Sequence, residues 1–145
     1  MEGNLYNKNA EQEFPQLSKD LREATLHKLK LFESIRGKEC NIPFWDIVVI
    51  TAIDAAQKQA YEQQIKEKTE RKELPLGVKF HVFNDPVGAK IGNGGSTLVV
   101  AKELESVYPD CAKNLKTLVL HAGGFSQRLP SGSLLGKIFM ALPMG

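Results

Sequence analysis

The stretch FWDIVVIT at residues 44–51 is short and rich in β-branched residues. A run of this kind is typical of a strand buried on both faces, as in a parallel sheet. Two later stretches have a similar character, VKFHVF at 78–83 and KTLVLHA at 116–122. The sequence therefore predicts three strands, and the first of them has the most apolar pattern.

Helix-favouring segments separate these strands. Residues 55–74 follow Asp54, and a second segment begins at a cap formed by Ser96 or Thr97 and runs to about Tyr108. Strands that alternate with helices imply right-handed crossovers and a mostly parallel sheet. We therefore expect an α/β fold with three parallel strands and flanking helices.

The segment before the first strand divides at Ser18. Residues 1–17 are polar, and we expect them to form a disordered tail. From Ser18, a plausible helix cap, apolar residues recur every three or four positions up to Gly37, which suits a left-handed stop. This pattern predicts an amphipathic helix at the start of a single domain that covers residues 18–145.

Composition limits the classes of partner. Lys and Arg number 19 and Asp and Glu number 17, for a net charge of only +2, whereas a dominant nucleic-acid surface usually has a larger excess. No apolar run approaches the ~20 residues that cross a bilayer, and the start lacks the order of a secretory signal. We expect neither nucleic acid nor a membrane as a partner.

The two cysteines, Cys40 and Cys111, are far apart and form no CxxC pattern. This spacing argues against a disulfide framework and against a zinc site. No N-glycosylation sequon is found. Reduced thiols in the cytoplasm are the expectation.

Two glycine-rich loops follow the second and third strands, at the ends where ligands of open α/β sheets bind. The loop after the third strand reads GGFSQRLP at residues 123–130, with Gly136 and Lys137 beyond it. Adjacent glycines let the backbone approach an anion, Arg128 offers a forked donor and Lys137 a second positive charge. The alternative is a surface turn with two solvated cations.

The other loop reads GAKIGNGGST at residues 88–97. It matches neither the Rossmann glycine pattern nor the Walker spacing. One interpretation is a mobile loop that caps the next helix through Ser96. The other is a second cradle for phosphate or sugar, and its residues would be Lys90, Gly92, Gly94, Gly95 and Ser96.

The remaining candidates have structural interpretations. Asp85 ends a strand, where it shapes a turn more often than it binds a metal. His121 is expected to be a hydrogen-bonded histidine of the core, His81 and His27 to be structural or exposed, and Trp45 to pack in the core. No residue is assigned as a metal ligand.

The blocks GGFSQRLP and LGKIF, together with FNDPVGAKIGNGGSTL and LPLGVKFHVF, resemble the fucose-1-phosphate guanylyltransferase (GDP-L-fucose pyrophosphorylase) family. The resemblance runs from about Leu21 to the end of the chain. It implies a partial Rossmann-like nucleotidyltransferase sheet, and the chain would be the incomplete N-terminal part of that domain. Gly136 stands where related motifs of sugar-nucleotide pyrophosphorylases usually have proline.

This resemblance also implies a reaction, in which GTP and L-fucose 1-phosphate give GDP-L-fucose and diphosphate. By the same resemblance, Gly123, Gly124, Ser126 and Arg128 would bind the nucleotide, and Arg128 and Lys137 would be catalytic. Mg²⁺ is expected in the full-length family, although no ligand for it is identifiable in this chain.

The chain ends soon after the second glycine-rich loop, and we expect a truncated isoform or fragment with no turnover on its own. The alternative is a non-catalytic nucleotide-binding remnant, or an interaction module that self-associates through an unpaired sheet edge. A small-molecule kinase that uses the GNGGST loop is a third, weaker hypothesis.

Overall fold

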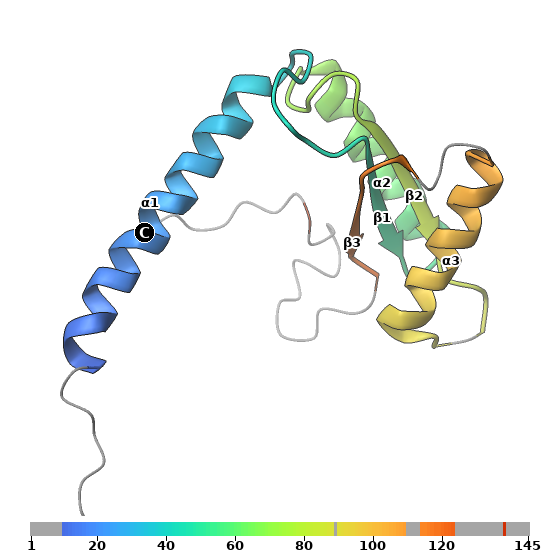
Figure 1. The fold of residues 1–145 in the computed structure, drawn as a ribbon. Helices are drawn as coiled ribbons and strands as arrows, with labels where there is room; N and C mark the ends of the chain where they lie inside the picture. Colours follow the sequence, from blue (N-terminus) through green and yellow to red (C-terminus); the bar gives the residue numbers. More distant parts are fainter. Residues whose placement is uncertain (1–9, 89, 110–113, 124–137, 139–145) are drawn as a thin grey trace, which may run out of the picture.

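A computed structural model describes residues 10–88, 90–109, 114–123 and 138 of the 145-residue chain. Helices and strands alternate along it (Figure 1). In chain order the elements are α1 (Ala10–Ile35), β1 (Ile47–Ala52), α2 (Ala55–Glu70), β2 (Lys79–Asn84), α3 (Gly92–Val107) and β3 (Thr117–His121).

The three strands form one open sheet in the order β2-β1-β3. Both pairings are parallel, and Val49 of β1 lies opposite His81 of β2 and Val119 of β3. The prediction of an α/β fold with three parallel strands and flanking helices is therefore confirmed. Because all strands run the same way, their carboxyl ends meet at one edge of the sheet.

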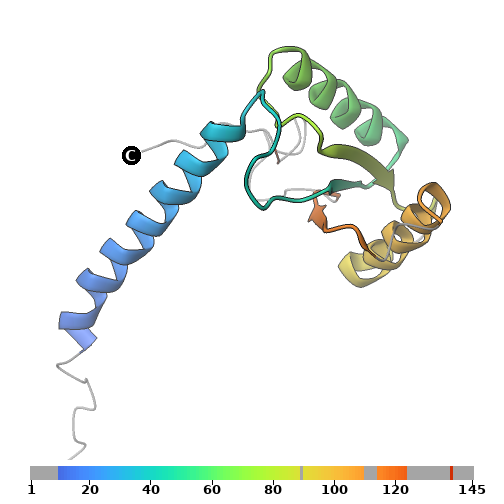
Figure 2. The same cartoon turned by 45° about the horizontal axis from the view of Figure 1, so that its top comes forward.

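The core lies on both faces of β1, whose six residues are all buried. Ile47 and Val49 pack against α3, whereas Ile50 and Ala52 pack against Tyr61 of α2. Successive residues of a strand point to opposite faces. The two helices therefore cover opposite faces of the sheet (Figure 2), which explains the continuous apolar pattern of the first strand.

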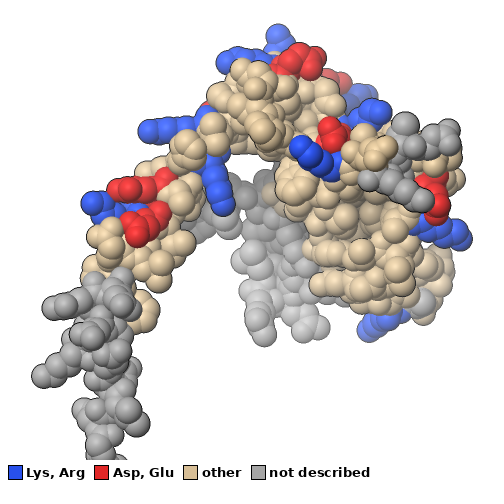
Figure 3. Space-filling model, viewed as in Figure 1, with Lys and Arg blue, Asp and Glu red and all other residues tan. Residues whose placement is uncertain are grey.

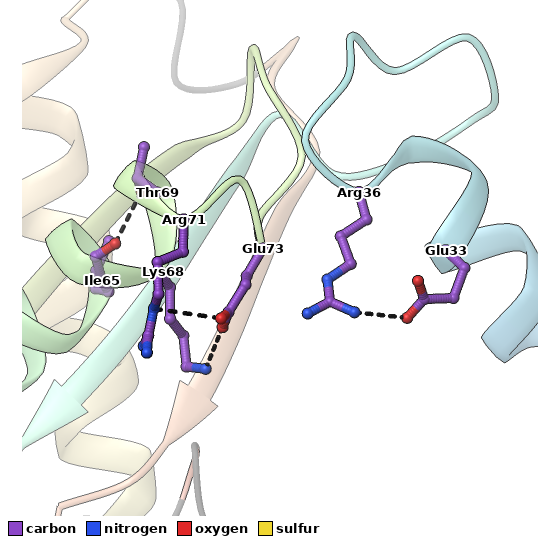
Figure 4. A network of polar contacts seen from close by, with 7 residues as sticks. All are labelled: Glu33, Arg36, Ile65, Lys68, Thr69, Arg71 and Glu73. Atoms are coloured by element: carbon purple, nitrogen blue, oxygen red, sulfur yellow. Dashed lines mark hydrogen bonds and ion pairs between the residues drawn. The ribbon is translucent and has the colours of Figure 1, made fainter.

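Helix α2 has a side-chain cap at its start and ion pairs just beyond its end. At its start the carboxylate of Asp54 accepts a hydrogen bond from the Gln57 amide at 2.8 Å. Just beyond its end, Glu73 binds Lys68 at 2.8 Å and Arg71 at 3.3 Å (Figure 4). The hydrogen bond from Lys68 lowers the pKa of Glu73. Helix α2 stops at Glu70, whereas the sequence predicted a helical segment that continues to residue 74.

Helix α1 begins at Ala10, so the predicted boundary at Ser18 is wrong. Residues 10–13 read AEQE, all good helix formers, and the helix continues through Pro15, although proline has no amide hydrogen to donate within the helix. The predicted stop is confirmed, because Gly37 has a φ of +66° just after the helix. A Cβ at position 37 would lie 2.7 Å from the Lys72 carbonyl oxygen, so packing also requires glycine there.

Helix α1 runs away from the sheet, as Figure 1 shows. Its apolar stripe is exposed over most of its length: Leu21 is 60% and Leu29 47% accessible, and only Ile35 at the end is buried. Charges of both signs alternate along its visible face (Figure 3). Within the described part of the chain, no helix is both long and apolar enough to cross a membrane.

Trp45 does not pack in the core as predicted, because it is 41% accessible. Strand β1 begins two residues later, at Ile47. The preceding Asp46 exchanges hydrogen bonds with Lys116: its carboxylate accepts from the Lys116 amide at 2.7 Å, and its own amide donates to the Lys116 carbonyl at 2.9 Å. These bonds hold residues 44–46 in a connection at the sheet margin, outside the strand.

His81 is structural, one of the two roles expected for it. Its Nε2 lies 2.7 Å from the hydroxyl of Tyr108, and the ammonium of Lys79 lies 4.8 Å from the centre of the Tyr108 ring. Partial burial of the imidazole, followed by the charge of Lys79, lowers the pKa of His81 below its ordinary value. Protonation of His81 therefore opposes folding.

We predict that stability falls as the pH drops below about 6.5, the ordinary histidine pKa. The unfolded chain binds a proton at His81 more readily than the folded chain, so the loss begins near that pH and ends at the lower folded pKa. Urea unfolding at pH 8, 6.5 and 5 should show this slope in the wild type and a shallower one in His81→Gln. His27→Gln, in which the exposed histidine of α1 is replaced, is the matched control. Equal slopes for His81→Gln and wild type would contradict this prediction.

Candidate functional site

The carboxyl edge of the sheet brings together the residues that follow the three strands. Strands β1, β2 and β3 end at Ala52, Asn84 and His121. The register aligns Ala52 with Asn84 and Thr51 with His121, so these ends are level. The candidate site consists of the segments that leave this edge.

Asp85 connects the end of β2 to both neighbouring elements. Its amide donates to the carbonyl of Ala52 in β1 at 2.9 Å, and its carboxylate accepts from the hydroxyl of Ser96 in α3 at 2.6 Å. Ser96 is only 6% accessible. Asp85 thus shapes the turn after β2, which is one of the two roles considered for it from the sequence.

The segment GNGGST is the first part of α3 and not a loop before it, because the helix begins at Gly92. The predicted cap at Ser96 or Thr97 is therefore wrong. The Ser96 hydroxyl donates to Asp85, and Ile91 precedes the helix with no side-chain cap. The first amides of a helix have no partner within the helix, and the side chain of Ile91 offers them no acceptor.

His121 is exposed, so its predicted place in the core is wrong, but its predicted hydrogen bond exists. Its Nε2 lies 3.2 Å from the Thr97 hydroxyl. That hydroxyl already donates its hydrogen to the carbonyl of Asn93 at 2.8 Å. His121 therefore supplies the hydrogen of the bond, which joins the end of β3 to the first turns of α3.

Gly123 is the described residue of the predicted nucleotide-binding loop. An ideal Cβ at this position would lie 3.1 Å from both the carbonyl carbon of Ala52 and the amide nitrogen of Ile53. The glycine therefore lets the chain leave β3 in close contact with the end of β1. Just before it, the buried Ala122 carbonyl accepts from the Tyr61 hydroxyl at 3.3 Å.

Only part of the predicted site can be placed. Gly124, Ser126, Arg128 and Lys137 lie outside the described residues. Of the second loop, Lys90 is exposed, and Gly92 and Gly94 have open space where a Cβ would stand. The structure thus brings Gly123 to the same sheet edge as the start of α3.

The described residues offer no ready site for Mg²⁺. Within residues 10–88, 90–109, 114–123 and 138, no group of three or more His, Cys, Asp or Glu side chains could hold a metal ion. The carboxylate of Asp85 is engaged by Ser96.

Sequence reasoning missed Thr51. Its hydroxyl accepts hydrogen bonds from the amides of Ala122 and Gly123, and the side chain is buried. One signal was present, since Thr51 is the polar residue at the end of an otherwise apolar strand. The hydrogen bond between Thr51 and Ala122, however, joins residues 71 positions apart in the chain, and such a contact leaves no local pattern in the sequence.

Comparison with known proteins gives a consistent result. The family model described as the fucose pyrophosphorylase domain matches residues 109–145. Fucose-1-phosphate guanylyltransferases from Homo sapiens and Mus musculus are 59% and 58% identical to this chain over 126 residues, which is 86% of its length. The chain closely resembles part of fucose-1-phosphate guanylyltransferase. The resemblance drawn from the glycine-rich blocks is thereby confirmed.

The similarity covers a small part of these relatives, because the matched region spans 21% of the human and mouse proteins. A more distant relative, the bifunctional fucokinase/GDP-fucose pyrophosphorylase of Arabidopsis thaliana, is 28% identical over 70% of this chain and 12% of its own length. No solved structure matches the chain.

We predict that Ser96→Ala lowers the free energy of unfolding by about 1.5–3 kcal/mol, the range for a hydrogen bond to a charged group. Urea unfolding measures the loss, and Ser34→Ala, which removes an exposed hydroxyl of α1, should change it by no more than about 0.5 kcal/mol. In an Asp85→Ala background, Ser96→Ala should cost clearly less. An equal cost in both backgrounds would show that the Ser96–Asp85 bond does not stabilise the fold.

Proposed function

We propose that this chain supplies a GTP-binding part of a fucose-1-phosphate guanylyltransferase. One observation carries the proposal: the glycine pair that follows β3 begins at the carboxyl edge of a parallel sheet, with Gly123 against the end of β1. This edge is where open α/β sheets bind ligands. The similarity to guanylyltransferases supports the choice of ligand.

In the proposed reaction, a phosphate oxygen of L-fucose 1-phosphate attacks the α-phosphorus of GTP. A new P–O bond forms to the sugar phosphate, the bond to the bridging oxygen of the β-phosphate breaks, and diphosphate leaves. Such transfers depend mainly on positioning and on neutralisation of phosphate charge. We assign nucleotide binding to Gly123, Gly124, Ser126 and Arg128, and charge neutralisation at the reacting phosphates to Arg128 and Lys137.

The start of α3 is the proposed second contact, for a phosphate or for the sugar. Gly92 and Gly94 leave the backbone open, and the N-terminus of a helix favours negative charge. Lys90 would add a positive charge. Because the Ser96 hydroxyl already donates to Asp85, Ser96 would act by holding this turn in place.

Two further features belong to the proposal. We place the reaction in the cytoplasm, in line with two widely spaced cysteines, of which Cys40 is a free thiol.

The alternative function is self-association through the sheet. It is favoured by the pairing, since β2 and β3 each pair only with β1 among the described strands, which leaves two open edges.

Isothermal titration of the chain with GTP tests the proposal. We predict that Arg128→Ala weakens binding about 10- to 100-fold, because a charge-assisted hydrogen bond contributes about 1.5–3 kcal/mol. Arg22→Ala, which removes an exposed guanidinium from α1, is the matched control and should bind like the wild type.

If Arg128→Ala and the wild type bound GTP with equal affinity, Arg128 would not be part of the binding site. Absence of GTP binding by the wild type, together with oligomers whose population grows with protein concentration, would favour the self-associating alternative. Sedimentation of the same samples provides that second readout.

A further inference from the structure

The backbone at the end of β3 is held by two side chains from other elements. The amide of Ala122 donates to the Thr51 hydroxyl at 3.2 Å, and its carbonyl accepts from the Tyr61 hydroxyl at 3.3 Å. The amide of Gly123 also points to the Thr51 oxygen, at 3.5 Å. These bonds continue the attachment of the chain to the rest of the sheet after the β3 ladder ends at His121.

Thr51 is suited to this role by its position and by its burial. It lies one residue before the end of the central strand, opposite His121, and is 3% accessible. A buried amide that loses its acceptor has no water to replace it. The Thr51 hydroxyl is therefore the acceptor that holds the amides of Ala122 and Gly123, whereas Tyr61 holds the Ala122 carbonyl.

We infer that Thr51 is a positioning residue for nucleotide binding: its hydroxyl fixes the backbone of Ala122 and Gly123 at the place where Gly123 meets the phosphates. This inference rests on the proposed function. Thr51 does not touch the nucleotide in this account, and it acts only through the two amides. Its effect should therefore depend on the hydroxyl and not on the size of the side chain.

Three variants separate the hydroxyl from packing. Thr51→Val keeps the shape and β-branching but removes the acceptor, whereas Thr51→Ser keeps the acceptor and removes the methyl group. Thr69→Val removes a hydroxyl that donates to the Ile65 carbonyl on the surface of α2, and it controls for the general effect of the substitution.

Amide hydrogen exchange measured by NMR and titration with GTP are the two readouts. We expect Thr51→Val to raise the exchange rates of Ala122 and Gly123 at least tenfold relative to those of Val49 and Ile50 in the same variant. The comparison within one variant separates local release from a general loss of stability. GTP binding should weaken about tenfold, and Thr51→Ser and Thr69→Val should resemble the wild type in both readouts.

The results that would contradict these expectations bear either on the role of Thr51 or on the proposed function. Unchanged relative exchange in Thr51→Val would overturn the inference, and so would faster exchange with unchanged GTP affinity. Equal losses of affinity in Thr51→Ser and Thr51→Val would also overturn it, because packing would then explain the effect. A wild-type chain without affinity for GTP would instead overturn the proposed function, and with it the ligand named here.

Discussion

The candidate site depends on the close approach of two backbones at the carboxyl edge of the sheet. Gly123 passes the junction of Ala52 and Ile53 so closely that any Cβ would be crowded at 3.1 Å. This contact is possible because β1 is the central strand and β3 is parallel to it in register. It places the start of the glycine-rich loop on the strand that the whole core surrounds.

Burial of β1 fixes the position of the carboxyl edge of the sheet. Its residues alternate between the face covered by α3 and the face covered by α2, and each face has its own apolar cluster. Polar bonds then tie the outgoing segments to the sheet: Asp85 binds Ser96, and His121 binds Thr97. The start of α3 and the end of β3 are thus joined by the bond between His121 and Thr97, although β1 lies between strands β2 and β3.

The sequence predicted most of the architecture, because the strand pattern is a direct consequence of burial. The run at residues 47–50 is apolar throughout since helices cover both faces of the strand. Helix boundaries were less predictable. The glycines at 92–95 read locally as a loop, yet they lie in the first turn of α3, where Ser96 is held by Asp85. Likewise, residues 10–17 look polar and unstructured, yet residues 10–13 read AEQE, all good helix formers, and α1 includes the whole segment.

The candidate site was predictable only where a motif carries its own chemistry. The glycine pair and Arg128 of GGFSQR form a local phosphate-binding pattern, and the same segment lies within the match to the fucose pyrophosphorylase domain. Thr51 and Tyr61 have no such meaning in the sequence, because their hydroxyls meet residue 122 only after the sheet and α2 have assembled. The long apolar stripe of α1 is a clear pattern as well, yet it faces solvent in this structure.

The most direct test of the central claim is a titration of ¹⁵N-labelled chain with GTP, followed through the backbone amide signals. We predict that the signals of Gly123 and of Gly92 to Gly95 shift together and saturate with one affinity. Shifts confined to α1 or to the outer surface of α2, with the amides at the carboxyl edge unchanged, would contradict it.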